Sequence, residues 1–340
     1  MVNQAKKIQN FLTNNIPKHP NDIVAITMKH FDIAKTTANR HLQHLIKANK
    51  VLKTGRTKQV RYSLAGALNQ ESSIAINKQF DEFTLYSTLI EPAIKAYLST
   101  EALDILEYCA TEMLNNCHDH SSGKQLTISI EIEKTQITLS ISDNGVGLFK
   151  HIHDSFHFED MRDVMLELSK GKLTTDAENH TGEGIFFSSR ACNIYSITAN
   201  NYCYEKNNQE NDWSFHSVDK TQGTTIKMTV ARNSEKNLTD IFLKYQDDDS
   251  LEFTKTDIVV ELSKSLGERL ISRSQAKRIL RRLENFKHIT LDFENIQTVG
   301  QGFVDEIFRV YQNKNPQTTF IYTNANDDVT FMIERGLANQ

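Results

Sequence analysis

The chain has 340 residues, of which 39% are hydrophobic and 24% are charged, and its formal net charge is −4. This length exceeds what one hydrophobic core usually serves, so it predicts two or three globular domains. No apolar run approaches the roughly 20 residues that cross a bilayer, and the first residues lack the apolar core of a signal peptide. These features exclude a membrane protein and predict a cytoplasmic one.

The charge is unevenly distributed along the chain. Residues 1–65 contain 12 Lys and Arg against 2 Asp and Glu, a balance of +10. The rest contains 27 basic against 41 acidic residues, a balance of −14. A basic arm on an acidic body is typical of a nucleic-acid-binding module attached to a regulatory body.

Residues 21–47 carry the pattern of two helices joined by a short turn. The first helix is predicted in "NDIVAITMKHF", with Asn21 in the capping position, and the second in "KTTANRHLQHLIKAN". Apolar residues of the second helix share one face: Ala38, Leu42, Leu45 and Ile46. Its other face carries Thr36, Thr37, Asn39, Arg40 and Gln43. Such a pair of helices can place side chains in a major groove.

A basic hairpin follows in "VLKTGRTKQVRYSL", where two strand-like runs flank a turn that contains glycine. Through "TTxxRHLxxL" and "GRTxxxRY", residues 3–64 resemble the winged helix-turn-helix of bacterial transcription regulators. We therefore expect a DNA-binding domain over residues 1–65, a homodimer, and double-stranded DNA as partner. The residues expected to contact DNA are Lys35, Thr36, Thr37, Arg40, Lys53, Arg56, Lys58 and Arg61. The alternative is a winged helix that serves only dimerisation or protein contact.

A long helix is predicted after a mixed connector that spans residues 66–99. Its sequence is "EALDILEYCATEMLNNCHDHS", in which apolar residues recur at helical spacing. Glu112 and Asn116 are four residues apart, so they stack on one helix face and can reach the same ligand.

Two strands are predicted next in "QLTISIEIEKTQITLSISDNGVGLF", because apolar and polar residues alternate. The second strand runs into Asp143, Gly145 and Gly147. This pattern suits a purine, since the carboxylate accepts the exocyclic amine and the missing side chains let the base lie on the backbone. Further along, "HTGEGIFFSSRACN" opens a helix whose amides and dipole favour phosphate, and "GTTIKMTV" places a glycine and a threonine at the head of a strand.

These four pieces, in this order, resemble the ATP-binding domain of the GHKL superfamily. This domain is the Bergerat fold, shared by the gyrase, heat-shock protein, histidine-kinase and MutL families. The resemblance covers about residues 100–232. Its N, G1, G2 and G3 boxes correspond to residues 112–116, 143–147, 182–184 and 223–224.

The resemblance implies ATP and Mg²⁺ as cofactors. Asn116 would coordinate Mg²⁺ between the phosphates, and Glu112 would orient or deprotonate the attacking nucleophile. Asp143 would bind the adenine amine, with Thr224 helping through a water. A lid over residues 148–180 would bring Lys170, Lys172 and His180 near phosphate. The other residues implied at the nucleotide are Asp119 at the edge of the adenine pocket and Gly145, Gly147, Gly182 and Gly184, which give access to the backbone.

Histidines near this motif raise the alternative of a zinc site. His118 and His120 flank Asp119, and the lid repeats the pattern with His151 and His153. A zinc site would need further ligands from elsewhere, so we expect these histidines to cap or solvate the helix end. The cysteines show neither a CxxC pair nor zinc-finger spacing, which predicts four buried free thiols: Cys109, Cys117, Cys192 and Cys203.

The sequence favours one branch of the GHKL superfamily over the others. No histidine lies between Leu64 and Glu101, where a histidine kinase would carry its phospho-acceptor. The lysine-bearing transducer domain of the topoisomerase and MutL branch also has no convincing counterpart. The short G2 loop that leads into "GIFFSSR" is closest to the anti-sigma-factor serine kinases.

Alternating strands and helices are predicted from residue 255 onward, as in an α/β layer fold. The stretch "ITLDFENIQTVGQGFVDEIF" resembles the core of STAS domains, antagonists that pair with GHKL serine kinases, and residues 250–340 resemble the STAS-like DUF4325 family. Where a phosphorylatable STAS domain has a serine pair, this chain has Gln301, with Thr298 as the nearest substitute. The basic run 273–282 is expected to be a solvated face.

The combined prediction is an α+β multidomain protein: a winged helix, a Bergerat sandwich with helices packed on one mixed sheet, and a STAS-like α/β domain. We expect a regulator that couples Mg-ATP binding, with slow hydrolysis, to DNA binding and transcriptional control. One alternative is a serine/threonine protein kinase acting on a regulatory protein partner. Another is a non-catalytic, ATP-dependent interaction scaffold.

Overall fold

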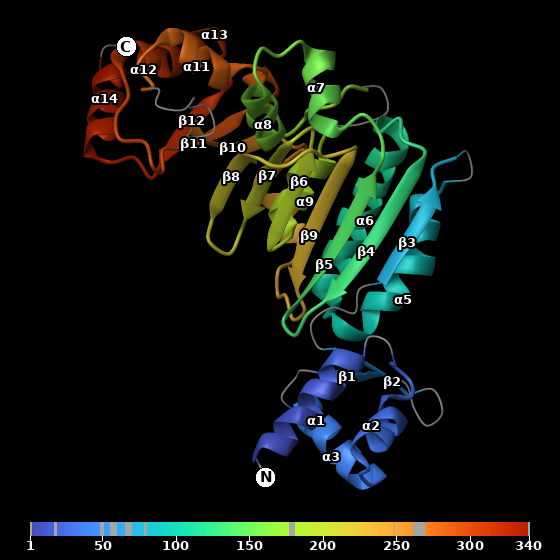
Figure 1. Cartoon of the computed structure of the whole chain (residues 1–340). Helices are drawn as coiled ribbons and strands as arrows, with labels where there is room; N and C mark the ends of the chain where they lie inside the picture. The colour runs from blue at the N-terminus through green and yellow to red at the C-terminus, as the bar shows by residue number, and fades with distance from the viewer. Residues whose placement is uncertain are drawn as a thin grey trace.

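The structure is a computed structural model. It describes residues 2–16, 19–47, 51–54, 60–64, 70–77, 80–176, 181–247, 249–260 and 269–338. Within these ranges the strands form three sheets, and the buried apolar side chains form three clusters. Figure 1 shows an N-terminal unit, a large central sheet and a C-terminal unit following one another along the molecule. None of the described helices combines the length and apolar character that crossing a bilayer requires.

The N-terminal unit contains three helices and a two-stranded antiparallel sheet. Its elements are α1 (Val2–Asn15), α2 (Ile23–Phe31), α3 (Lys35–Lys47), β1 (Val51–Thr54) and β2 (Arg61–Leu64). Apolar residues of all three helices meet in one small cluster, which includes Leu12, Ile23 and Leu42. The capping prediction for Asn21 is wrong: Asp22 is the N-cap residue of α2, and its side chain makes no capping hydrogen bond.

The central sheet has seven strands in the order β3-β4-β5-β9-β6-β7-β8. Every neighbouring pair is antiparallel, so the prediction of a mixed sheet is wrong. The reason is that β9 inserts between β5 and β6 and runs opposite to both. The strands are β3 (Gln70–Ala75), β4 (Gln125–Ile132), β5 (Gln136–Asp143), β6 (Ile194–Ala199), β7 (Tyr202–Asn207), β8 (Asp212–Ser217) and β9 (Thr224–Ala231).

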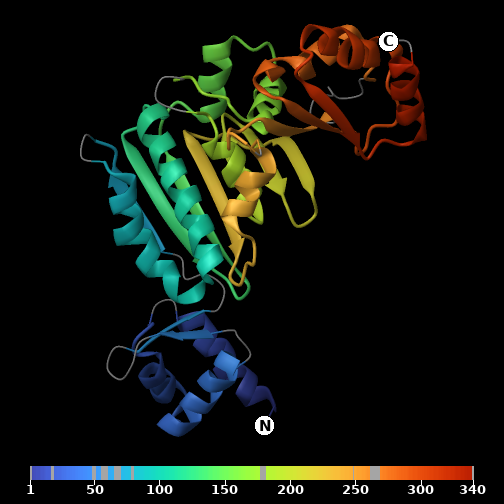
Figure 2. The ribbon, with the colours of Figure 1, turned by 180° about the vertical axis from the view of Figure 1, so that it is seen from behind.

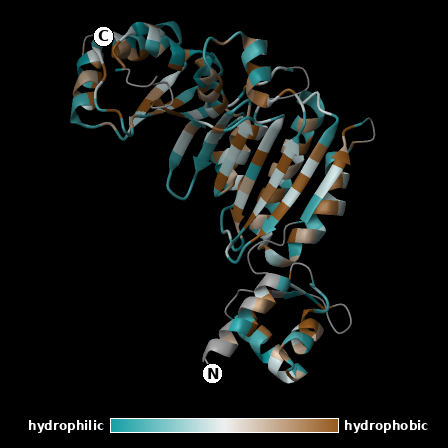
Figure 3. Ribbon diagram, in the orientation of Figure 1, coloured by the Kyte–Doolittle hydropathy of each residue, from teal (hydrophilic) through white to brown (hydrophobic). Residues whose placement is uncertain are grey.

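One face of this sheet is apolar and covered by helices. Along β4 and β5 every second residue is buried, and Figure 3 shows the matching alternation of apolar and polar residues. Seen from behind in Figure 2, the long helix α6 (Thr100–His120) lies across this face. It is joined there by α9 (Gly184–Ala191) and α10 (Leu238–Tyr245). The opposite face carries Ser and Thr pairs such as Thr138 with Thr229, whose hydroxyl oxygens are 2.8 Å apart.

Residues 66–99, predicted as a connector, contribute a strand and a helical segment to the central unit. β3 pairs with β4 as an edge strand of the central sheet. The helical segment behind it packs Tyr86, Ile90 and Ile94 into the same core as α6. That segment consists of α4 (Glu82–Leu85), the π-helix η2 (Tyr86–Ile90), α5 (Glu91–Ile94) and the 3-10 turn η3 (Lys95–Tyr97). The sequence prediction missed it because the helix pattern is short and broken by Pro92.

Two helices occupy the segment between β5 and α9, which the sequence left without an assigned structure. They are α7 (Leu148–Phe156) and α8 (Met161–Lys170). Figures 1 and 2 both show them at one end of the central sheet, with α8 next to the C-terminal unit.

The C-terminal unit has a parallel sheet in the order β10-β11-β12, which agrees with the predicted α/β alternation. Its core is continuous with the central unit, because Phe186 and Phe187 of α9 belong to the same cluster as Ile289 and Phe303. Its strands are β10 (Lys255–Val259), β11 (His288–Asp292) and β12 (Thr319–Thr323). Its helices are α11 (Arg273–Leu280), η5 (Leu283–Asn285), α12 (Gln301–Asp305), η6 (Glu306–Tyr311), α13 (Gln312–Lys314) and α14 (Asp327–Leu337).

The basic run 273–282 is not simply a solvated face, which corrects the sequence prediction. Arg278 Nε lies 2.9 Å from an oxygen of Asp163, and Arg282 Nε lies 3.8 Å from Glu167. Both carboxylates belong to α8. The sequence could not reveal these pairs, because the arginines lie more than 100 residues after α8 in the chain.

Leu139 tests the central core. Its side chain is fully buried on β5, which is hydrogen-bonded on both sides, so Leu139→Ala should lower the free energy of unfolding by about 2 to 5 kcal/mol. Leu243→Ala makes the same chemical change at a side chain that is 49% exposed, and should change stability by no more than about 0.5 kcal/mol. Chemical denaturation of the full chain measures both. Equal effects of the two substitutions would contradict this account of the core.

Candidate functional site

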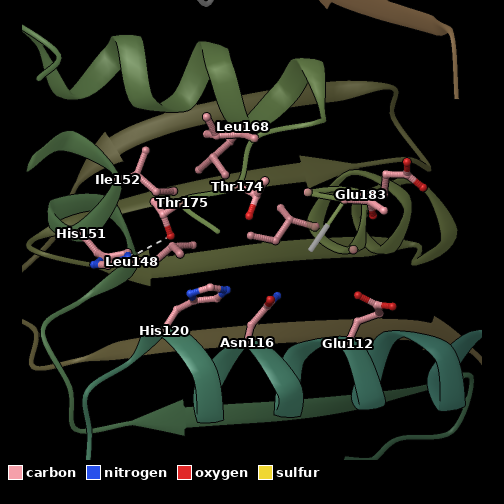
Figure 4. A pocket seen from close by; sticks show the side chains of 15 residues that line it. Glu112, Asn116, His120, Leu148, His151, Ile152, Leu168, Thr174, Thr175 and Glu183 are labelled. Carbon is pink, nitrogen blue, oxygen red and sulfur yellow. Dashed lines mark hydrogen bonds between the residues drawn. The ribbon is translucent and has the colours of Figure 1, made fainter. Parts of the chain in front are cut away.

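A cleft lies between α6 and the segments around α7, α8 and the start of α9. Three side chains of α6 enter it at intervals of four residues, Glu112, Asn116 and His120, because this spacing keeps them on one helix face. Figure 4 shows them pointing toward the opposite wall, with His120 on the side of Leu148 and Glu112 on the side of Glu183. The remaining lining residues are His151, Ile152, Leu168, Leu173, Thr174, Thr181, Gly182, Glu183, Gly184 and Ile185.

A second, smaller cavity adjoins the first at the ends of the central strands. The two cavities share four lining residues, so they form one cleft with a large and a small chamber. Asp143 and Thr224 line the small chamber from the neighbouring strands β5 and β9. The shared residues are Asn116, His120, Leu148 and Ile185.

Asp143 is a buried carboxylate, with 6% of its surface exposed. One of its oxygens accepts a hydrogen bond from the Gly145 amide at 2.7 Å, and the other accepts from the Cys117 thiol at 3.9 Å. Burial raises the pKa of Asp143 above its ordinary value, and hydrogen bonds from Gly145 and Thr224 oppose that rise. A buried acceptor held in this way can bind a donor group of a ligand in the small chamber.

Two glycines make close approaches within the cleft. A Cβ on Gly184 would lie 2.1 Å from a carboxylate oxygen of Glu112, so a side chain there would displace that carboxylate. Gly223 has a φ of +64°, and a Cβ there would lie 1.9 Å from the Asp143 carbonyl oxygen. These glycines bring the backbone close to Glu112 and Asp143.

The structure brings most of the predicted site residues together. Glu112, Asn116, Gly182 and Gly184 line the large chamber, and Asp143 and Thr224 line the small one. The remaining glycines lie next to these residues: Gly145 donates to Asp143, and Gly147 is the N-cap of α7.

Asp119 is not among the lining residues, unlike its predicted place at the pocket edge. Its carboxylate lies 2.7 Å from Nδ1 of His118. The His118 ring stacks on Phe80. The reason is helical rotation: a step of three residues from Asn116 turns a side chain about 60° away, whereas a step of four keeps it closer to the same face.

The predicted lid lysines point away from the cleft. Lys172 Nζ donates to the Asn285 carbonyl at 3.1 Å and lies over the rings of Phe253 and Phe286. Lys170 is buried, and its Nζ lies 2.6 Å from Glu167. Both therefore serve the boundary with the C-terminal unit in this structure. His180 lies outside the described residues.

His120 and His151 line the cleft, a position that the sequence did not predict for either of them. Their ring centroids are 6.1 Å apart, and His151 Nε2 lies 3.2 Å from the Thr175 hydroxyl. The spacing of four residues from Asn116 could have identified His120, whereas no sequence signal marks His151. In the part of the chain that the structure describes, no three His, Cys, Asp or Glu side chains are grouped to hold a metal ion. All four cysteines are buried and free, as predicted.

The charges of the large chamber are mostly acidic. Glu112 and Glu183 line it, and none of its described lining residues is a lysine or an arginine. Burial raises the pKa of Glu183, while nearby Lys172 lowers it. An anionic ligand in this chamber would therefore need a counter-cation or the two histidines.

The predicted DNA-contacting residues are mainly exposed. Lys35, Thr36 and Arg40 lie exposed on α3, and Thr37 is partly buried there. Lys53 on β1 and Arg61 on β2 are exposed at the neighbouring hairpin. Arg56 and Lys58 lie outside the described residues.

Gly223 offers a test of the strand-end geometry. Gly223→Ala would place a methyl group against the Asp143 carbonyl at a positive φ, so it should cost more than about 2 kcal/mol of stability. Gly302→Ala is the control, because its new Cβ would meet nothing closer than 3.4 Å within α12. Thermal unfolding of the two variants should show a clear loss only for Gly223→Ala. An unchanged melting temperature for that variant would contradict the geometry.

Comparison with known families gives one match. A family model described as a STAS-like domain of unknown function (DUF4325) matches residues 275–330, from α11 into α14. A search of curated proteins found no match to the chain. The C-terminal part of the chain thus carries a STAS-like domain of the DUF4325 family.

Proposed function

We propose that the chain is a regulator that binds Mg-ATP in a GHKL-type cleft and DNA through an N-terminal winged helix. The observation that carries the proposal is the convergence of the predicted motifs on one cleft. Glu112 and Asn116 come from α6, Asp143 and Thr224 from two paired strands, and Gly182 and Gly184 from the start of α9. Residues from four separate stretches of sequence share this space.

The small chamber suits adenine. The Asp143 carboxylate lines it as a hydrogen-bond acceptor, and an exocyclic amine is a donor. Ile185 and Ile226 supply apolar surface for a flat base. Thr224 lines the same chamber and hydrogen-bonds Asp143, which holds the carboxylate in place.

The large chamber suits the phosphates together with a divalent cation. Gly182 and Gly184 place the first amides of α9 at its wall, where the helix dipole favours an anion. Mg²⁺ would supply the positive charge that phosphate needs beside Glu112 and Glu183. The Asn116 amide oxygen is suited to hold that ion, since Mg²⁺ takes few protein ligands and keeps several waters.

Glu112 is the residue that we propose for slow ATP hydrolysis. It lines the phosphate chamber one helical turn before Asn116, and the missing side chain of Gly184 leaves room for its carboxylate. A carboxylate in that position can accept a proton from an attacking water.

The N-terminal unit supports DNA binding through its charge and shape. Residues 1–65 carry the balance of +10, and α3, which exposes polar side chains, packs against β1 of the hairpin. We propose that α3 enters the major groove and that the hairpin lies against phosphates, with a homodimer binding two half-sites.

The ATP site is tested by removing its ligand-binding groups. Asn116→Ala and Asp143→Asn should each weaken Mg-ATP binding at least tenfold, which corresponds to about 1.4 kcal/mol. The matched controls are Asn115→Ala and Asp219→Asn, which change the same residue types outside the cleft lining and should leave affinity unchanged. Isothermal titration calorimetry measures all four.

A wild-type chain that does not bind Mg-ATP would refute the proposal, and so would equal affinities across these variants. Turnover adds a second readout. Radiolabelled ATP should yield free phosphate slowly, and Glu112→Ala should abolish this. Transfer of the label to a protein would instead favour the kinase alternative.

DNA binding is tested at α3. Arg40→Gln should weaken binding of double-stranded DNA by removing a contact of α3 in the major groove. Lys53→Gln on the neighbouring hairpin removes one phosphate contact, so it should reduce the salt-dependence slope by about 0.9. Lys314→Gln removes an exposed charge from the C-terminal unit and should change nothing. Fluorescence anisotropy with and without Mg-ATP, on wild type and Asn116→Ala, also shows whether the nucleotide affects DNA affinity. If the wild type does not bind DNA, the proposal of DNA binding is refuted, and the alternative that the N-terminal unit serves dimerisation or protein contact is favoured.

A further inference from the structure

Two buried carboxylates on α8 face the C-terminal unit. Asp163 is 4% exposed and Glu167 is 3% exposed. Arg278 Nε lies 2.9 Å from Asp163, Arg281 Nη1 lies 3.7 Å from it, and Arg282 Nε lies 3.8 Å from Glu167. Because a buried carboxylate is costly without a partner, these pairs hold α8 in place. We refer to these five residues as the latch.

Backbone contacts reinforce the latch at the end of α8. The Lys170 ammonium donates to the Arg281 carbonyl at 2.8 Å, and the Thr256 hydroxyl donates to the Lys170 carbonyl at 2.7 Å. Arg282 also donates to the Lys172 carbonyl at 3.3 Å. The chain from residue 170 to residue 172 is therefore held by groups of the C-terminal unit.

The same stretch of chain continues directly into the cleft. Leu168 on α8 lines the large chamber, and so do Leu173, Thr174 and Thr175. Only one residue separates the Lys172 carbonyl, which Arg282 holds, from Thr174 in the wall. Thr175 in turn contacts His151 of α7 on the same side of the chamber. The wall therefore depends on contacts made by the C-terminal unit.

We propose that the C-terminal unit controls the nucleotide affinity of the cleft in cis, through the latch between α8 and the end of α11. With the latch closed, residues 168–175 are held as a preformed wall, so the ligand does not have to order them. The inference rests on the proposed nucleotide function. Coupling is reciprocal, so bound nucleotide also strengthens the docking of the C-terminal unit. Anything that engages the STAS-like domain and opens the latch thereby releases nucleotide.

The test neutralises one pair of the latch without leaving a buried charge unpaired. Asp163→Asn combined with Arg278→Gln removes both charges of the closest pair. The matched control is Asp305→Asn with Arg273→Gln, an ion pair of 2.9 Å between α11 and α12 that lies within the C-terminal unit. Both double variants keep the net charge of the full chain.

The latch variant should bind Mg-ATP about 5- to 20-fold more weakly than the wild type, in the range of typical coupling between sites. The control should bind like the wild type. Without nucleotide, hydrogen–deuterium exchange of residues 171–176 should be faster in the latch variant alone. With Mg-ATP, exchange in α11 of the wild type should slow.

The outcomes separate the two hypotheses. If the wild type does not bind Mg-ATP, both the proposed function and this inference are refuted. Should the wild type bind while the latch variant binds within twofold of it, or exchanges like it over residues 171–176, only the inference falls. Where the double variant does not fold, Arg278→Lys takes its place, because it keeps the charge but loses the guanidinium geometry, and a smaller loss of affinity in the same direction is expected.

Discussion

The packing of α6 against the apolar face of the central sheet is the constraint on which the other features depend. Ile105, Leu106, Met113 and Leu114 of α6 are buried in the same cluster as the inward-facing residues of β4, β5 and β9. Because these positions turn inward, the other side of the helix presents Glu112, Asn116 and His120 to the cleft. The same packing sets the distance from α6 to the strand end that carries Asp143. The proposed base acceptor Asp143 and the proposed metal ligand Asn116 are therefore held by elements of the core.

A second constraint acts across the boundary with the C-terminal unit. Phe186 and Phe187 follow the glycines of the cleft in α9, and their side chains are buried in the core of the C-terminal unit. Arg190 of the same helix is buried and lies 3.1 Å from Asp257 on β10. α9 thus contributes Gly184 and Ile185 to the cleft, and Phe186, Phe187 and Arg190 to the boundary. The STAS-like domain is built onto the wall of the cleft, which gives a physical basis for coupling between them.

Much of the fold and part of the site could be predicted from the chain alone. The alternation in β4 and β5 and the helical stripe of α6 are local patterns, so the elements follow from neighbouring residues. The spacing of Glu112 and Asn116 placed both on one face, and the structure agrees. Lys172 and Asp119 show where such reasoning fails. Lys172 turns to Asn285 and Asp119 turns to His118, and both choices depend on neighbours that no local pattern identifies.

By itself the sequence determined the order of the motifs, the helical face shared by Glu112 and Asn116, and the glycines that let the backbone approach them. Those properties follow from spacing and from the absence of a Cβ, which are local. Only the tertiary structure decided that β9 lies between β5 and β6, that His151 enters the cleft, and that Arg278 pairs with Asp163. These relations join residues far apart in the chain, and their energies come from burial and from charge pairing at the contact. A basic run read alone looks solvated, and it becomes a partner only when folding brings a buried carboxylate to it.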